Sequence, residues 1–260
     1  FAAGLLLMVA VLIALVLGWA NIAFHVETDP KAEAVNDALP GANCGGCGYV
    51  GCMEYAQAVA DGEADITLCG PGGTSCAQKI ANIMGVELTE TWPFKAVVHC
   101  AATREQRLKQ QPYFGEQSCA AANLVPGVQG CVYGCLGYGD CFDVCDYDAI
   151  DMIDGLAVIN TDKCTGCKAC VSACPRGIIS MVPFKRKEVL VVACSNKDKG
   201  PIVKEVCTIG CIGCSACARP SEGLISMVDN LPVMDYEHYD ADSNLQKSID
   251  KCPRESLVYI

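Results

Sequence analysis

The sequence predicts an α+β protein in four parts: a transmembrane N-terminal helix, a small helical domain rich in cysteine, and two modules of short helices and hairpins that carry further cysteine runs. Three observations predict it. No charged residue occurs from Phe1 to Phe24, 21 of the 260 residues are cysteine, and one set of cysteine spacings recurs later in the chain. The expected boundaries of the parts are residues 1–26, 27–90, 91–188 and 189–260.

The cysteines indicate metal or iron–sulfur ligation rather than disulfides. Most of them lie two or three residues apart, often with glycine between them, and such neighbours converge on one point more readily than they pair across a fold. Only three histidines are present, too few for several His-containing zinc sites. Thiol ligation indicates a reducing compartment, the cytoplasm, and the net charge of −11 argues against a nucleic-acid partner.

Residues 1–26 begin with the uncharged run FAAGLLLMVAVLIALVLGWANIAF. About twenty such residues span a ~30 Å hydrocarbon core as a helix, and Trp19 suits an interfacial position. A signal peptide would have a basic leader and a small-residue cleavage site instead. We therefore expect a single-pass anchor in the cell (inner) membrane, with the soluble part of the chain on the cytoplasmic side.

Residues 27–90 contain the first set of spaced cysteines, C-x2-C-x4-C-x16-C, formed by Cys44, Cys47, Cys52 and Cys69. Glycines among them free the backbone to curl around a bulky cofactor. A helix over 53–60 is expected to carry the chain away before it returns to Cys69. An all-thiolate zinc site is the alternative, but this spacing in a Gly-rich loop favours a [4Fe-4S] cluster.

Residues 91–188 carry the strongest signal, CTGCKACVSACP at 164–175. Its spacing is the bacterial two-cluster ferredoxin run, in which three cysteines hold one cubane and the fourth ligates the other. The partner run lies upstream, where Tyr138 occupies the usual middle position and Cys131 is expected to substitute. A hairpin turning at Asp154-Gly155 is predicted between the runs. The expected ligand sets are Cys131, Cys135, Cys141 and Cys174 for one cluster, and Cys145, Cys164, Cys167 and Cys170 for the other.

Residues 189–260 predict a second, degenerate ferredoxin-like module. Cys207-x3-Cys211-x5-Cys217 repeats the spacing of the upstream run, and VVAC at 191–194 echoes VVHC at 97–100. Ser221 stands where a fourth cysteine is expected, and Cys252-Pro253 alone remains of the second run, whose other cysteines are replaced by Asp242, Leu245 and Ser248. In the two-cluster ferredoxin pattern, one cubane takes three ligands from the first run and one from the second, so the remaining cysteines of this module form the ligand set of one cubane. They are Cys211, Cys214, Cys217 and Cys252.

These assignments predict four [4Fe-4S] clusters on sixteen cysteines. Five cysteines have no assigned cluster: Cys76, Cys100, Cys119, Cys194 and Cys207. Cys100 and Cys119 fit no run and are interpreted as buried structural thiols. Cys207 is the reserve ligand if Cys211 or Cys214 does not bind.

The order of these parts resembles the B subunit of the Rnf complex, an ion-translocating ferredoxin:NAD⁺ oxidoreductase, in its long form. The resemblance rests on the apolar N-terminal run, the CGGCGYVGC domain and the run at 164–175. It implies electron transfer from soluble ferredoxin to the flavin/NAD-reducing and membrane subunits of the complex, with no catalytic residue on this chain. Asp146, which replaces the proline expected after Cys145, departs from the ferredoxin pattern.

Two other functions are alternatives at this point. The chain could be the iron–sulfur subunit of another membrane oxidoreductase, hydrogenase-like or quinone-linked, or a zinc-organised interaction protein without a redox role. No phosphate loop or nucleophile–base pair stands out in the sequence to indicate a flavin or nucleotide site.

Overall fold

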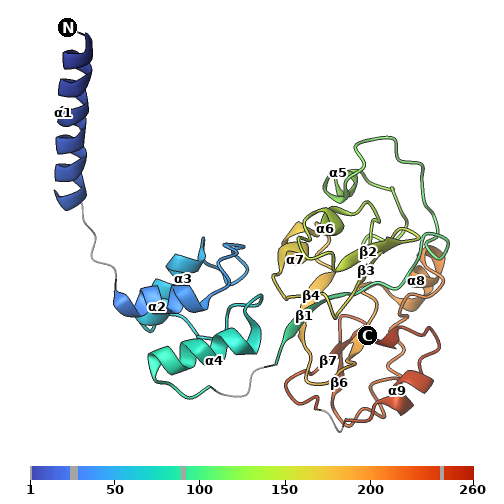
Figure 1. The fold of residues 1–260 in the computed structure, drawn as a ribbon. Coiled ribbons are helices and arrows are strands. Elements are labelled where there is room, and N and C mark those ends of the chain that lie inside the picture. The colour runs from blue at the N-terminus through green and yellow to red at the C-terminus, as the bar shows by residue number, and fades with distance from the viewer. Residues whose placement is uncertain (1, 24–28, 89–91, 241–242) are drawn as a thin grey trace.

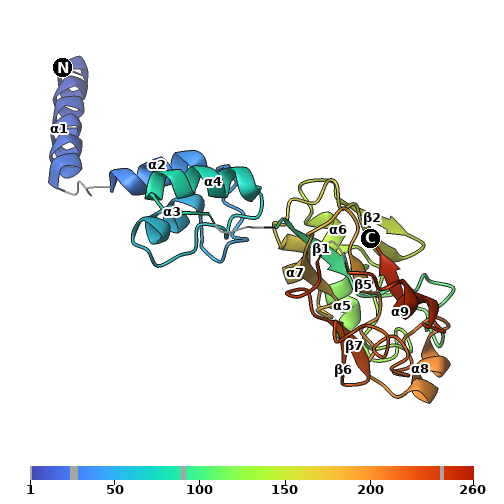
Figure 2. The ribbon, with the colours of Figure 1, turned by 90° about the horizontal axis from the view of Figure 1, so that it is seen from below.

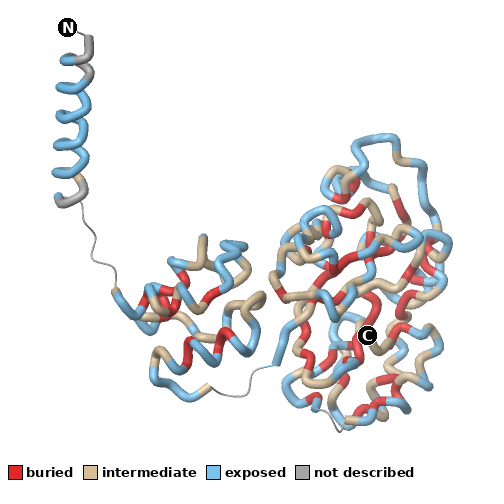
Figure 3. The backbone as a smooth tube through the Cα atoms, viewed as in Figure 1, coloured by how far each residue is buried: buried red, intermediate tan, exposed pale blue. Residues whose placement is uncertain are grey.

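The computed structural model describes residues 2–23, 29–88, 92–240 and 243–260. An N-terminal helix stands apart, three helices form a second body, and the strands lie together in a third (Figure 1, Figure 2). Buried residues line the inner faces of the three-helix body and run through the strand-containing body (Figure 3). The two cysteine-bearing bodies therefore have separate apolar cores.

Helix α1 (Ala2–Ala23) coincides with most of the predicted transmembrane anchor, whose residues 1 and 24–26 lie outside the described ones. Crossing a ~30 Å hydrocarbon core takes about twenty consecutive, predominantly apolar residues in one helix. Among the residues that the structure describes, no helix is both long enough and apolar enough to do so. The predicted anchor, and the single-pass location in the cell membrane that depends on it, are therefore wrong.

The small cysteine-rich domain consists of α2 (Pro30–Ala38), α3 (Cys52–Ala60) and α4 (Gly73–Met84). Helix α2 begins after Asp29, whose side chain accepts a hydrogen bond from the backbone N–H of Lys31. Val35, Tyr55 and Ile80, one from each helix, are at most 1% exposed and form the core. This core holds the loops between the helices, where Cys44, Cys47 and Cys69 lie, and the start of α3, where Cys52 lies.

The first ferredoxin-like module consists of β1 (Phe94–Val98), α5 (Cys119–Asn123), α6 (Asp140–Asp143), β2 (Ile150–Ile153), β3 (Leu156–Ile159), α7 (Ala169–Ala173) and β4 (Ile179–Pro183). Strand β1 pairs antiparallel with β4, and β2 pairs antiparallel with β3. The predicted hairpin is confirmed: Asp154 and Gly155 both have positive φ, as a two-residue I′ turn requires. The first and last strands of the module are thus paired.

The second module repeats this topology with β5 (Leu190–Val192), α8 (Gly200–Val206), β6 (Ile225–Val228), β7 (Leu231–Met234), α9 (Gln246–Asp250) and β8 (Leu257–Tyr259). Strand β5 pairs antiparallel with β8, and β6 forms a hairpin with β7. Asp229 and Asn230 have positive φ in its turn, as their counterparts do in the first module. The internal duplication inferred from the cysteine spacing therefore extends to the strand order.

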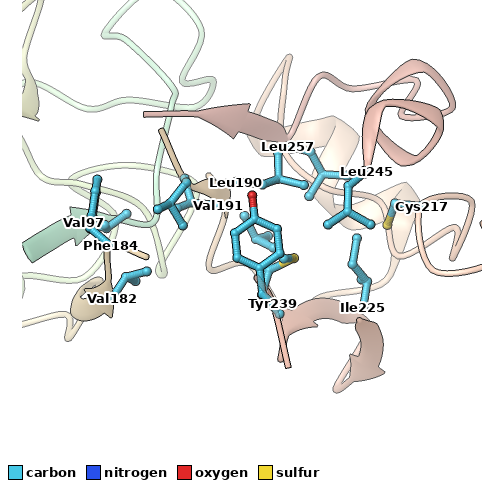
Figure 4. Close-up of a cluster of buried hydrophobic side chains, with 13 residues drawn as sticks. Val97, Val182, Phe184, Leu190, Val191, Cys217, Ile225, Tyr239, Leu245 and Leu257 are labelled. Carbon is cyan, nitrogen blue, oxygen red and sulfur yellow. The ribbon is translucent and has the colours of Figure 1, made fainter. Parts of the chain in front are cut away.

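An apolar core occupies the part of the second module where cysteines are missing. Ser221, Leu245 and Ser248, which stand at cysteine positions of the ferredoxin pattern, are at most 2% exposed. Leu245 packs with Tyr239 in the cluster that also contains Cys217 (Figure 4). Asp242 lies outside the described residues. Apolar side chains fill this core in place of further cysteines.

Candidate iron–sulfur sites

The cysteines gather in five groups of four, each lining one pocket. Tetrads 1 to 4 are Cys44, Cys47, Cys52 and Cys69; Cys145, Cys164, Cys167 and Cys170; Cys119, Cys135, Cys141 and Cys174; and Cys211, Cys214, Cys217 and Cys252. A further group, here the interface tetrad, is Cys100, Cys131, Cys194 and Cys207. All 21 cysteines are free thiols, and only Cys76 belongs to none of the five groups.

Tetrad 1 contains the four cysteines predicted for the first cluster. Its loop is closed by Asn43, whose Oδ1 accepts a hydrogen bond from the backbone N–H of Cys52 at 2.8 Å. Gly45 and Gly48 have φ of 69° and 95°, a conformation that few other residues adopt. The segment with the C-x2-C-x4-C spacing forms one loop because these two glycines allow the backbone to turn twice.

Tetrad 2 likewise contains the predicted set. Strand β1 borders its pocket, and the backbone N–H of Ala96 points to Cys164 Sγ at 3.4 Å. Burial raises the pKa of the Cys170 thiol to about 12. In the metal-free chain this thiol is therefore protonated at neutral pH, and metal binding must displace its proton.

Tetrad 3 differs from the predicted set by one residue. The structure brings Cys119, not Cys131, to the pocket of Cys135 and Cys174. Ser118 caps α5 there, and the carboxylate of Asp140 accepts hydrogen bonds from the first backbone N–H groups of the helix, including that of Cys119 at 2.6 Å. Tyr138 leaves the middle position of the run without a thiol, and Cys119 reaches the pocket from a separate helix.

Tetrad 4 contains the predicted cysteines of the second module. Cys252, distant in sequence, lies in the pocket of the other three. The backbone N–H of Ser256 points to Cys252 Sγ at 3.3 Å. Burial raises the pKa of the Cys217 thiol to about 11, although Cys214 is exposed. The solitary Cys252-Pro253 thus completes a group of four sulfurs.

The interface tetrad was absent from the sequence predictions. Two of its members follow β1 and β5, and the other two precede Cys135 and Cys211 by four residues. The signal that could have found them is the repeat itself. Cys100 and Cys194 close the matching VVHC and VVAC segments, and Cys131 and Cys207 open the matching C-x3-C segments. The four are two pairs of equivalent residues.

The tetrads fit polynuclear clusters. Among the described residues, no three Cys, His, Asp or Glu side chains are placed to hold a single metal ion. The pocket of tetrad 3, including the solvent at its mouth, encloses about 360 Å³, room for a larger group among its sulfurs. Amide N–H groups directed at Cys164 and Cys252 sulfurs are donors of the kind that tune such clusters.

Two arginines bind equivalent backbone positions in the two modules. Arg176, after Cys174-Pro175, donates from Nη1 to the carbonyls of Cys131 and Gly134 at 2.7 and 2.9 Å. Arg254, after Cys252-Pro253, donates to the carbonyls of Cys207 and Gly210 at 2.9 and 3.1 Å. Each arginine therefore ties the end of one cysteine run to the C-x3-C loop of its own module.

The two arginines should differ in their contribution to stability. Gln129 also donates to both carbonyls bound by Arg176, whereas among the described residues no second side chain donates to those bound by Arg254. We therefore expect Arg254→Met to destabilise the cluster-loaded protein by about 1 kcal/mol more than Arg176→Met. In thermal unfolding under anaerobic conditions this is a further fall of about 2–4 °C. Equal midpoints for the two variants would refute the argument.

The tetrads follow one another through the structure. A Cβ on Gly70, beside Cys69 of tetrad 1, would lie 2.5 Å from the carbonyl oxygen of Gly166, beside Cys167 of tetrad 2. Cysteines of tetrads 2 and 3 share one buried cluster. The interface tetrad touches tetrad 4, where the backbone N–H of Cys211 points to Cys194 Sγ at 3.3 Å. Clusters held here would form a series.

The comparisons with known proteins agree with this chemistry. Residues 39–71 match the family described as "Putative Fe-S cluster", and residues 157–180 match "4Fe-4S binding domain". The chain is 40% identical to the B subunit of the Na⁺-translocating ferredoxin:NAD⁺ oxidoreductase complex of Acetobacterium woodii, over 90% of this chain and 70% of that protein. It is 37% identical to the B subunit of the proton-translocating ferredoxin:NAD⁺ oxidoreductase complex of Clostridium ljungdahlii, over 97% and 89%. It is 36% identical to the B subunit of the ion-translocating oxidoreductase complex of Methanosarcina acetivorans, over 91% and 86%.

Proposed function

We propose, on the premise that this chain belongs to the B-subunit family of Rnf-type ion-translocating oxidoreductase complexes, that it relays electrons from reduced soluble ferredoxin to the other subunits of its complex. The chain is an iron–sulfur electron-transfer subunit of such a complex. The electron donor, and the flavin/NAD-reducing and membrane subunits as acceptors, are the proposed part. Family membership favours this function over a zinc-organised protein or a subunit of another oxidoreductase.

Tetrads 1 to 4 are the proposed ligands of four [4Fe-4S] clusters. Three of them are the sets predicted from spacing, and in tetrad 3 Cys119 replaces Cys131. When bound, such clusters supply one-electron chemistry. The protein supplies the thiolates, the amide groups directed at their sulfurs, and the burial that sets each potential.

The observation that carries the proposal is the close succession of the tetrads. Gly70 and Gly46 let the loop of tetrad 1 rest directly on the backbone of Gly166 and Cys167. No side chain stands between these two loops at the points of contact. Such direct packing favours electron passage from the small helical domain into the ferredoxin-like modules.

Anaerobic titration with a reduced bacterial two-cluster ferredoxin tests the proposal. We expect the purified full chain to lose its visible iron–sulfur absorbance as electrons are taken up, with new EPR signals from the reduced clusters. Cys252→Ala, which removes one ligand of tetrad 4, should lower the uptake by about one electron per chain. Ser226→Ala, at an exposed position of β6 outside all five groups, is the control. A chain with its full iron content that stays oxidised beside reduced ferredoxin contradicts the proposal.

A further inference from the structure

We propose that the interface tetrad is a fifth [4Fe-4S] site, assembled from both ferredoxin-like modules and joining tetrad 3 to tetrad 4. The inference rests on the iron–sulfur function proposed above. It adds a cluster that the ferredoxin cysteine spacing does not predict. In a ferredoxin, three ligands of a cluster come from one cysteine run, whereas no two of these four cysteines belong to the same run.

The first support is the construction of the pocket. Cys131, Cys194 and Cys207 are at most 9% exposed, and Cys100 is half-buried in the same pocket. All four cysteines are free, so the group is not two disulfides. Four converging thiols around a larger space fit a cubane.

The second support is a set of donors directed at the sulfurs. Asn196, only 2% exposed, donates from Nδ2 to Cys131 Sγ at 3.4 Å. Its backbone N–H points to Cys194 Sγ at 3.5 Å, as does that of Cys211 at 3.3 Å. Hydrogen bonds to ligand sulfurs stabilise the thiolate form and tune the potential of iron–sulfur clusters. A pocket that served only apolar packing would not need a buried amide side chain aimed at a thiol.

The third support is a set of hydrogen bonds that joins the two modules beside the pocket of the interface tetrad. His99, which precedes Cys100, contacts the carbonyl of Val192 through Nδ1 and Ser180 Oγ through Nε2, both at 2.7 Å. Ser195, which follows Cys194, donates from Oγ to the carbonyl of His99 at 2.8 Å. The contacts of His99 with Val192 and of Ser195 with His99 cross between the modules beside two tetrad members, and the contact with Ser180 fixes the His99 ring within the first module. They hold the ligand-bearing segments in register without any contribution from a metal.

Arg107 supplies a fixed positive charge at the same pocket. It is 7% exposed, lines the pocket, and donates to the carbonyls of Ala102 and Gly155. A [4Fe-4S] cluster on four thiolates carries net negative charge, so a buried guanidinium beside it is favourable. Without such a group in the pocket, the buried cation would lack a counter-charge at this position.

The position of the interface tetrad between tetrads 3 and 4 indicates its role in electron transfer. Gly134 precedes Cys135 of tetrad 3, and a Cβ at Gly134 would lie 3.5 Å from Cys131 Sγ and 3.8 Å from Cys100 Sγ. On the other side, Cys211 of tetrad 4 donates to Cys194. The interface tetrad therefore touches the backbone of both neighbouring groups. A cluster here would accept one electron from one neighbour and pass one electron to the other.

The iron and acid-labile sulfide content of the full chain, purified anaerobically, tests the proposal. We expect about 20 iron per chain, against about 16 for four clusters, and a native mass that corresponds to five clusters. Cys194→Ala should lower the content to about 16, and Cys100→Ala/Cys194→Ala should lower it no further because both residues belong to one site. Cys119→Ala/Cys194→Ala should fall to about 12 because two sites are affected. Ser226→Ala, at an exposed position of β6, should stay at about 20.

The possible results distinguish failure of the fifth site from failure of the proposed function. A wild-type content of about 16 that Cys194→Ala leaves unchanged overturns the fifth site and leaves the proposed function standing. Wild-type protein with zinc and no sulfide overturns both. If Cys194→Ala does not fold, Cys207→Ala probes the same site from another segment, and the native mass of the wild type decides the number of clusters without any variant.

Discussion

Stripping iron from this protein is expected to unfold residues 94–260 while the three-helix body keeps more of its structure. Among the described residues every sheet has two strands, and helices α5 to α9 have at most seven residues. Two-stranded hairpins and helices this short are marginal in water by themselves. Cysteines of tetrads 2 and 3 stand inside the buried cluster of the first module. Metal binding at such sites contributes folding free energy directly.

Hydrogen exchange after anaerobic chelation measures this effect. Amides of β1 to β8 should exchange at close to unfolded rates once iron is lost, whereas amides in the middle of α3 and α4 should exchange more slowly. Helices α2 to α4 are longer and share a core of apolar side chains. Reloading with iron and sulfide should restore the protection. If the strands keep cluster-loaded protection after the iron has fallen to below about one per chain, the apolar cores are sufficient and the prediction is refuted.

The double substitution Gly46→Ala/Gly70→Ala should separate the small helical domain from the ferredoxin-like modules. The added methyl groups would overlap the carbonyl oxygens of Cys167 and Gly166. Overpacking of this kind costs roughly 1–3 kcal/mol, and undocking of the domain relieves it. Since 1.4 kcal/mol is tenfold in an equilibrium, we expect the equilibrium constant for docking of the domain to fall by about ten- to a hundredfold. Electron passage from tetrad 1 to tetrad 2 should slow in proportion.

Rapid-mixing reduction followed by EPR measures that passage, and iron analysis must show an unchanged content in the variant. The matched control is Gly18→Ala, since a Cβ at Gly18 meets no atom within 4 Å. Unchanged transfer in the double variant, with an intact iron content, would show that the contact between these two loops does not carry the electrons.

The spacing of cysteines predicted those parts of the sites that single loops determine. Three cysteines of tetrad 1 and three of tetrad 2 come from short runs, where the chain geometry between neighbouring cysteines leaves few ways to arrange them. Cys119 could not be predicted in this way, because it reaches its pocket through a helix fixed by Asp140, a contact distant in sequence. The hairpin of β2 and β3 was predicted from the Asp154-Gly155 turn, and the duplication of the module from its cysteine repeat, whereas the pairing of the first with the last strand of each module was not predicted.

The predicted place of Cys131 beside Cys135 and Cys174 shows what cysteine spacing alone cannot determine. Tyr138 left a gap in the run, and the nearest upstream cysteine was the natural candidate by sequence distance. In the structure the carbonyl of Cys131 is held by Arg176 and its thiol accepts from Asn196. The partner of its thiol comes from the other module, and no local pattern encodes that proximity. The apolar run at the N-terminus was similarly interpreted from composition alone, and the membrane anchor predicted from it was wrong.

The pairing of β1 with β4 and of β5 with β8 brings the two ends of each module side by side. A segment whose ends are adjacent can be placed in a surface loop of a host protein without separating the chain on either side of it. A tandem copy of such a segment therefore adds to the chain without breaking the first copy, and the apolar core that the two modules share packs the copies against each other.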